Sequence, residues 1–181
     1  MIAALKILLA LAVVALAQTA VLAYMVSDRV QLLKTGREIT LPIVPVDPRD
    51  LLRGEYVRLG YEISRVPAAL LDGPPAKPHE TIYVVLEKKE GGAWHPVRAT
   101  RAFPSDSNPD RIVLKGRAVV GGLGVRYGVE SYFVPQGEGP KLEAAARSKK
   151  LAALVAVDKG GNAAIKGLII DGKLQYEEPL F

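Results

Sequence analysis

The stretch VDPRDLLRGEYVRLGYEI, residues 46–63, places a turn, a break and an alternating segment side by side. Apolar and polar residues alternate in its second half with a period of two, which is typical of a half-buried β-strand. We predict a strand over residues 55–64 whose core face carries Val57, Leu59, Tyr61 and Ile63. The stretch therefore indicates a chain built around β-strands.

The first half of this stretch predicts one or two helical turns. Asp47 before Pro48 is typical of an N-cap followed by the first helical position. Asp50 can accept a hydrogen bond from the cap amide, as in a capping box. Gly54 suits the left-handed residue that ends a helix. The residues of the stretch that remain without a structural explanation are Arg53, Glu55, Tyr56 and Arg58.

The N-terminal segment is apolar enough to cross a membrane. Residues 7–26 form a run of twenty residues interrupted only by Gln18 and Thr19. At 1.5 Å per residue such a helix spans a hydrocarbon core of about 30 Å. A cleaved signal peptide is the alternative, since residues 15–17 and 21–23 offer small residues at the required spacing. We favour an anchor because the run is longer than a typical signal peptide core.

The predicted organisation has four parts. A flank covers residues 1–6, a transmembrane helix residues 7–26, a juxtamembrane helix or linker residues 27–37, and one β-rich domain residues 38–181. Lys6 before the span competes with Arg29, Lys34 and Arg37 after it under the positive-inside rule. The short basic N-terminus resembles an export signal, so we expect the domain outside the cytoplasm, anchored in the inner membrane.

Most of the remaining chain also predicts strands. Residues 38–46 are extended, and Pro42 and Pro45 indicate a sheet edge or a polyproline-like approach to the sheet. Residues 80–103 form a hairpin around Gly91 and Gly92, with Pro96 marking its return strand as an edge. Further strands are expected at residues 111–120, 125–134, 151–157 and 163–170, with a helix over residues 141–150.

This pattern indicates a mainly β (α+β) fold. About eight strands with one or two short helices favour an antiparallel barrel or sandwich. A doubly wound parallel sheet is excluded, because it requires long helices between its strands.

Composition excludes several classes of site. The chain has no cysteine, so it has no disulfide, thiolate nucleophile or cysteine-ligated metal, and its two histidines make a His-rich metal site improbable. Its net charge is +5. The local basic bias lacks the interleaved aromatic residues of a single-strand nucleic-acid binder, so we expect no nucleic acid partner. That bias comes from Arg111, Lys115, Arg117 and Arg126.

Two groups of polar residues are candidates for a site. Asp47, Asp50 and Glu55 can be read as ligands of a divalent cation, but the capping roles of the two aspartates explain them as well. The strand over residues 125–134 is expected to carry Arg126, Glu130 and Tyr132 on one face, either as a ligand-facing patch or as a solvated ion pair. We predict no cofactor and no metal.

Residues 54–61, GEYVRLGY, resemble the motif of the GDYXXLXY family of membrane-anchored bacterial proteins, with Glu55 where the family usually has Asp. Residues 126–143 resemble its second recurrent block. Leu59 and Tyr61 fall on motif positions. The family has no established activity. The resemblance implies a single-pass protein, often accompanied by polytopic membrane proteins of unknown role.

Two functions of different classes follow. The favoured one is an interaction or accessory module that docks on a polytopic membrane protein or an envelope component, through the faces of Tyr56 and Arg126. The alternative is a membrane-anchored hydrolase or small-ligand binder. RGEYV also resembles a strand of type I signal peptidases, but the chain has no Ser-x-Met-Pro block to supply their nucleophile. The serines left for such chemistry are Ser64, Ser131 and Ser148.

Overall fold

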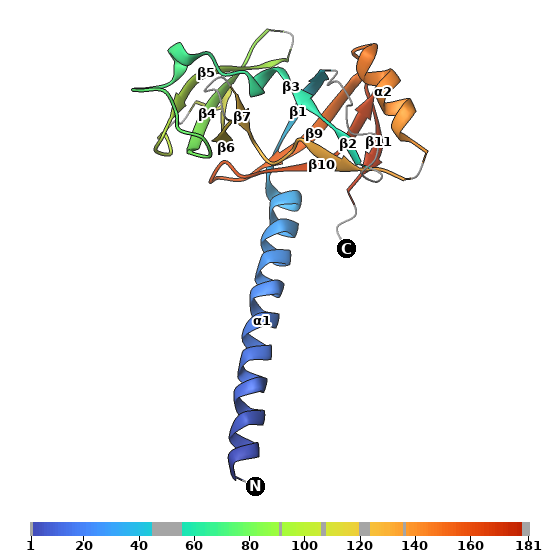
Figure 1. Ribbon diagram of the computed structural model, residues 1–181. Helices are drawn as coiled ribbons and strands as arrows, with labels where there is room; N and C mark the ends of the chain where they lie inside the picture. Colours follow the sequence, from blue (N-terminus) through green and yellow to red (C-terminus); the bar gives the residue numbers. More distant parts are fainter. Residues whose placement is uncertain are drawn as a thin grey trace.

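The computed structural model describes residues 2–44, 56–90, 92–105, 108–119, 124–135 and 137–178. The predicted turn with Asp47, Pro48, Asp50 and Gly54 lies outside these residues, and so do Arg53 and Glu55. The N-terminal helix α1 runs from Ile2 to Thr35, and the rest of the described chain forms a β domain that lies across its end (Figure 1).

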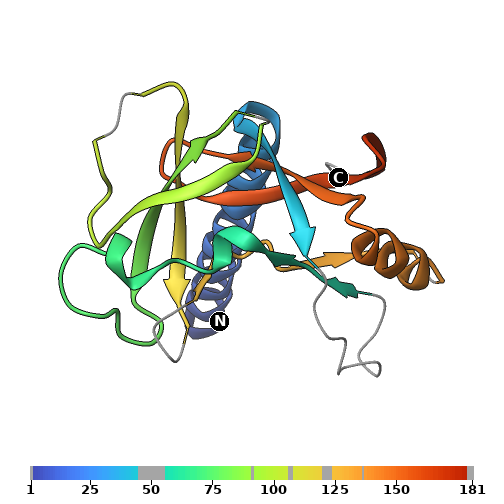
Figure 2. The ribbon, with the colours of Figure 1, turned by 90° about the horizontal axis from the view of Figure 1, so that it is seen from above.

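Helix α1 enters the domain without a flexible linker. Its last turn buries Leu32 and Leu33 against Ala156 and Ala164 of the domain. The Gly36 N–H donates to the carbonyl of Leu32 at 2.9 Å. A Cβ on Gly36 would lie 2.5 Å from that carbonyl oxygen, so this close exit from the helix requires glycine. Viewed from above, α1 lies beneath the sheets (Figure 2).

The first sheet has five strands in the order β11-β10-β9-β1-β3. Its long strands are β1 (Arg37–Val44), β9 (Leu151–Val157) and β10 (Ala163–Ile170). The prediction that Pro42 marks β1 as an edge strand is wrong. Pro42 pairs with Ala152 on the β9 side, while β3 pairs only with Ile43 and Val44 on the other side. The proline is tolerated because the β3 side of the strand is unpaired beside it among the described residues.

The sheet continues beyond the last strand expected from the sequence. Strand β11 (Lys173–Glu177) pairs with β10 across a turn at Asp171 and Gly172. Its exposed, polar composition hides the alternation that would have predicted it. The helix predicted over residues 141–150 is α2 (Gly139–Arg147), which ends earlier because Lys149 has a positive φ of 56°.

The second sheet has four strands in the order β5-β4-β6-β7. The predicted hairpin is confirmed as β4 (Thr81–Lys88) paired with β5 (Trp94–Thr100), and β5 is an edge strand, as Pro96 indicated. Strand β6 (Arg111–Ala118) pairs with the other side of β4, and the short β7 (Val125–Arg126) pairs with β6. The segment that joins β6 to β7 includes Gly121 and Gly122, which lie outside the described residues.

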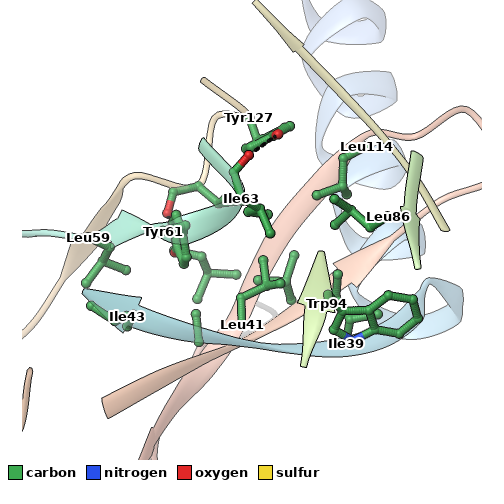
Figure 3. Close-up of a cluster of buried hydrophobic side chains, with 14 of the residues drawn as sticks. Ile39, Leu41, Ile43, Leu59, Tyr61, Ile63, Leu86, Trp94, Leu114 and Tyr127 are labelled. Carbon is green, nitrogen blue, oxygen red and sulfur yellow. Dashed lines mark hydrogen bonds between the residues drawn. The ribbon is translucent and has the colours of Figure 1, made fainter. Parts of the chain in front are cut away.

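The two large sheets share one hydrophobic core, so the domain is an open, sandwich-like β fold, and of the two predicted architectures the sandwich is correct. Ile39, Leu41 and Ile43 of β1 belong to the same buried cluster as Leu86 and Leu114 of the second sheet (Figure 3). All five side chains are buried. The described chain has eleven strands where about eight were expected, partly because two predicted strands are broken.

Both breaks occur in the sequence blocks singled out above. The predicted strand over residues 55–64 is β2 (Tyr56–Arg58), β3 (Gly60–Tyr61) and a 3₁₀ turn, η1 (Glu62–Ser64). A second 3₁₀ turn, η2, follows at Ala68–Leu70. The predicted strand over residues 125–134 is divided into β7 and β8 (Ser131–Phe133). Strands β2 and β8 pair with each other as a separate two-stranded sheet.

Candidate functional site

The two recurrent sequence blocks meet in space. Strand β2 is antiparallel to β8, with Val57 opposite Tyr132 and Arg58 opposite Ser131. The contact continues past the strand end, where the Leu59 N–H donates to the Glu130 carbonyl at 2.9 Å. Residues about seventy positions apart in the chain therefore form one joint.

Two buried tyrosines fasten this joint from opposite sides. The Tyr61 hydroxyl donates to the carbonyl of Val129 at 2.7 Å, and the Tyr127 hydroxyl donates to the carbonyl of Ile63 at 2.7 Å (Figure 3). Burial raises the pKa of both phenols well above the ordinary value, and the nearby charge of Glu130 adds to the effect. Both phenols are therefore neutral hydrogen-bond donors in the folded protein, with a structural role.

Glu130 holds the turn between β7 and β8. Its carboxylate accepts the backbone N–H of Tyr127 at 2.6 Å and that of Gly128 at 3.0 Å. Gly128 has a φ of 82°, a conformation in which a side chain would be strained. The carboxylate thus satisfies two backbone donors in a place where no strand pairs with them.

This turn shifts the alternation by one residue. Val125, Tyr127 and Val129 are buried before it, and Tyr132 and Val134 after it. The prediction that Tyr132 shares an outer face with Arg126 and Glu130 is therefore wrong, because Tyr132 points into the core. Phe133, which the same alternation would place on the face opposite Arg126, is 78% exposed. A period-two pattern continued across a turn gives the wrong face for every residue after it.

The other predicted site residues are dispersed. Arg58 is exposed on the β2–β8 ribbon, while Arg126 is exposed on β7. Tyr56 is opposite Phe133 in the backbone register, and its side chain is outside the described part of the structure. The solvated ion pair considered for Arg126 and Glu130 does not form, because the carboxylate of Glu130 is hydrogen-bonded to backbone.

Arg126 belongs to a basic groove. The groove has a volume of about 660 Å³ and lies between the β4–β6–β7 face and the turn that joins β9 to β10. Of its residues, sequence reasoning had singled out Lys115, Arg117, Arg126 and Glu130 but not their neighbours. The polar side chains that it missed are His79, Thr81 and Asn162. No local signal marks them, because the register of three strands and a distant turn brings them together.

The described residues show no arrangement typical of serine catalysis. The Ser148 hydroxyl donates to the carbonyl of Ala144 at 3.0 Å, as in an ordinary helix end. Ser131 is exposed opposite Arg58, and Ser64 ends a 3₁₀ turn. In the described ranges none of these hydroxyls is hydrogen-bonded to a lysine or histidine side chain.

The acidic candidates remain untested. Asp47, Asp50 and Glu55, for which the sequence left a cation site as the alternative to capping roles, lie outside the described residues. Among the residues that the structure does describe, no group of three or more acidic or histidine side chains could hold a metal ion.

These features define a class: an open antiparallel β domain carried on one N-terminal apolar helix that is long enough to cross a membrane. A family model described as "GDYXXLXY protein" matches residues 18–168, which is most of the chain. The chain belongs to the GDYXXLXY family, and the resemblance noted in its sequence is confirmed. No curated protein and no solved structure is detectably similar to it.

Proposed function

We propose that this protein is an accessory subunit of a membrane complex, with α1 as a retained anchor and the β domain outside the cytoplasm. The observation that carries this proposal is the packed joint between α1 and the domain. Leu33 is only 4% exposed, and β1 begins two residues after the helix ends. A domain mounted in this way keeps one height and one orientation above the bilayer.

The height follows from the length of helix outside the apolar run. Leu32 lies six positions after Val26, which corresponds to about 9 Å of helix. The base of the domain then lies just outside the lipid headgroups, since that layer adds about 5–7 Å on each side of the hydrocarbon core. Its sides are at the height where the loops of a polytopic protein emerge.

The β2–β8 ribbon offers the surface that we assign to this partner. Phe133 is 78% exposed, and Arg58 is exposed on the neighbouring strand. Aromatic and arginine side chains contribute most to protein interfaces. We propose that the ribbon docks on an extracytoplasmic loop of a polytopic membrane protein.

Photo-crosslinking in native membranes tests the docking. A photoreactive residue replacing Phe133 is expected to capture one discrete integral membrane protein, and Arg58→Glu is expected to abolish the product. The matched control is Leu174 on β11, which is 47% exposed in a different sheet. Equal capture from both positions, or none from Phe133, would refute the docking surface.

Topology has its own test. A reporter fused after Phe181 that fluoresces or folds only outside the cytoplasm is expected to be active, and the mature protein is expected to begin at or near Met1 by mass spectrometry. A reporter active only in the cytoplasm contradicts the orientation. A mature N-terminus near Gln18 or Tyr24 contradicts the retained anchor.

A further inference from the structure

A row of polar side chains crosses three strands at the basic groove. Thr81 of β4 is opposite Arg117 of β6, and Arg117 is opposite Arg126 of β7. Residues in register on neighbouring antiparallel strands point to the same face of the sheet. Lys115 lies on that face too, two residues before Arg117. One hydroxyl, two guanidinium groups and an ammonium group thus share one surface.

The three cations of this row are not neutralised. Within the described part of the chain, none of the three forms an ion pair, whereas other basic residues, such as Arg98 and Arg101, do. Glu130, the carboxylate that lines the same groove, already accepts two backbone N–H groups. Two like charges directly opposite each other on neighbouring strands destabilise a sheet. An anion bound between them would remove this repulsion.

The walls of the groove are fixed by the fold. The Lys115 N–H donates to the carbonyl of Gly161 at 2.8 Å, which holds the β9–β10 turn against β6. Inside this turn the Asp158 carboxylate accepts the backbone N–H of Asn162 at 2.8 Å. On the other side, β7 approaches β6 so closely that a Cβ on Gly116 would lie 2.3 Å from a Val125 methyl. The row therefore lines a preformed hollow.

We propose that this groove binds a small phosphate-bearing ligand, with Arg117 and Arg126 as the guanidinium forks and Lys115 as an additional cation. The planar guanidinium group can bind two oxygens of one phosphate with two parallel hydrogen bonds. Three cations suit a multiply charged phosphate better than a single carboxylate. A volume of about 660 Å³ is in the range of small-molecule pockets.

The phosphate can belong to a soluble metabolite or to the headgroup of an anionic phospholipid, and the chemistry of recognition is the same. Two probes distinguish the sources. The full-length protein in zwitterionic micelles receives either sodium pyrophosphate, with sodium chloride at equal ionic strength as control, or dihexanoyl phosphatidic acid. The readouts are the thermal unfolding midpoint and the dissociation constant from calorimetry.

We expect at least one probe to raise the midpoint, and Arg126→Gln to weaken its binding by about tenfold or more. Arg147→Gln, which removes the same charge from an exposed residue of α2, is the matched control and should bind as the wild type does. Arg126→Lys should give an intermediate dissociation constant, since lysine keeps the charge and loses the fork.

Each outcome decides the proposal. A shift with pyrophosphate that depends on Arg126 supports a soluble ligand, and one seen only with phosphatidic acid supports a lipid headgroup. No binding of either probe, or equal weakening by Arg126→Gln and Arg147→Gln, overturns the site. Arg126→Gln should not lower the unfolding midpoint of the unliganded protein, because it removes a contact between like charges. Measuring that midpoint therefore distinguishes a variant that fails to fold from one that folds and no longer binds the probe.

Discussion

Two regions of the domain are built in different ways: the five-stranded sheet that packs on α1, here called the anchored sheet, and the contact between the two sequence blocks around β2 and β8, here called the motif joint. In the anchored sheet, β9 and β10 form long strands of seven and eight residues that pair along most of their length, with one register shift between Ile165 and Gly167. In the motif joint, β2, β3, β7 and β8 have only two or three residues each, and side chains replace the missing ladder. The hydroxyls of Tyr61 and Tyr127 and the carboxylate of Glu130 all bind backbone groups there.

This difference explains what a sequence motif can mean. Long strands tolerate many apolar sequences, because any residue of suitable size can fill an alternating position. Short strands joined by side chain–backbone hydrogen bonds require particular residues, because a buried carbonyl or N–H left without its partner destabilises the fold. Leu59 and Tyr61 of the motif therefore have structural roles, and the ligand groove uses other residues.

The largest effect is expected where β7 approaches β6 most closely. In Gly116→Ala the new methyl would lie 2.3 Å from Val125 and 2.8 Å from the carbonyl oxygen of Arg126. Because backbone must move to admit it, we expect a loss of about 3 kcal/mol in the free energy of unfolding by urea, or no folding. The matched control is Gly139→Ala, where nothing lies within 4 Å and little change is expected.

The two buried phenols of the motif joint predict that the free energy of unfolding falls at alkaline pH. Their folded pKa is raised above the ordinary tyrosine value of 10.0, so their contribution to stability is complete below pH 10 and declines as the pH rises above it. Each phenol should contribute a decline of about 1.4 kcal/mol per pH unit.

Urea unfolding at pH 8 and pH 11 measures this decline, with the Tyr61→Phe, Tyr127→Phe double variant as comparison. The double variant should be less stable than the wild type at pH 8, because two carbonyls lose their donors, and its stability should fall less at pH 11. Parallel pH profiles would show that other groups cause the decline.

The anchored sheet should be most sensitive at its joint with the helix. Leu33→Ala removes a buried side chain between α1 and the β9–β10 pair, and we expect it to lower the unfolding free energy by about 2–3 kcal/mol. Leu22→Ala, at an exposed position on the same helix, is the control. Equal small effects would indicate that α1 and the domain are not packed together.

A smaller effect is expected from Glu130→Gln. The amide keeps one accepting oxygen, while the carboxylate uses two to bind the N–H groups of Tyr127 and Gly128. We expect a loss of about 1–2 kcal/mol, and Glu143→Gln on the exposed face of α2 should have almost none. Equal losses of unfolding free energy in Glu130→Gln and Glu143→Gln would show that Glu130 does not stabilise the turn.

Much of the fold follows from local patterns. The hairpin of β4 and β5 and the helix α2 were predicted within a few residues, since each carries a periodic pattern bounded by a turn signal. The strands β9 and β10 were predicted because two apolar runs flank a glycine-containing turn. Strand β11 was missed, because its alternation is masked by polar residues. The break after Arg126 was missed because the hydrogen bonds of Glu130 are local but leave no mark on hydropathy.

The candidate site was harder to predict, for a physical reason. Arg117 and Arg126 were noticed as charges, but their pairing depends on the register of β6 with β7, and Thr81 reaches the same row through β4. Asn162 lies in the turn between β9 and β10, which belong to the first sheet. Register and sheet packing are long-range properties that no single segment encodes.

Disulfide trapping tests the joint between the two blocks most directly, because the natural chain has no cysteine. Arg58 and Ser131 are exposed and directly opposite each other, so the Arg58→Cys, Ser131→Cys pair should cross-link under mild oxidation of the full-length protein in membranes. The Arg58→Cys, Phe133→Cys pair, two residues out of register, should react much more slowly. Absence of the first cross-link, or equal rates for both pairs, would contradict the joint.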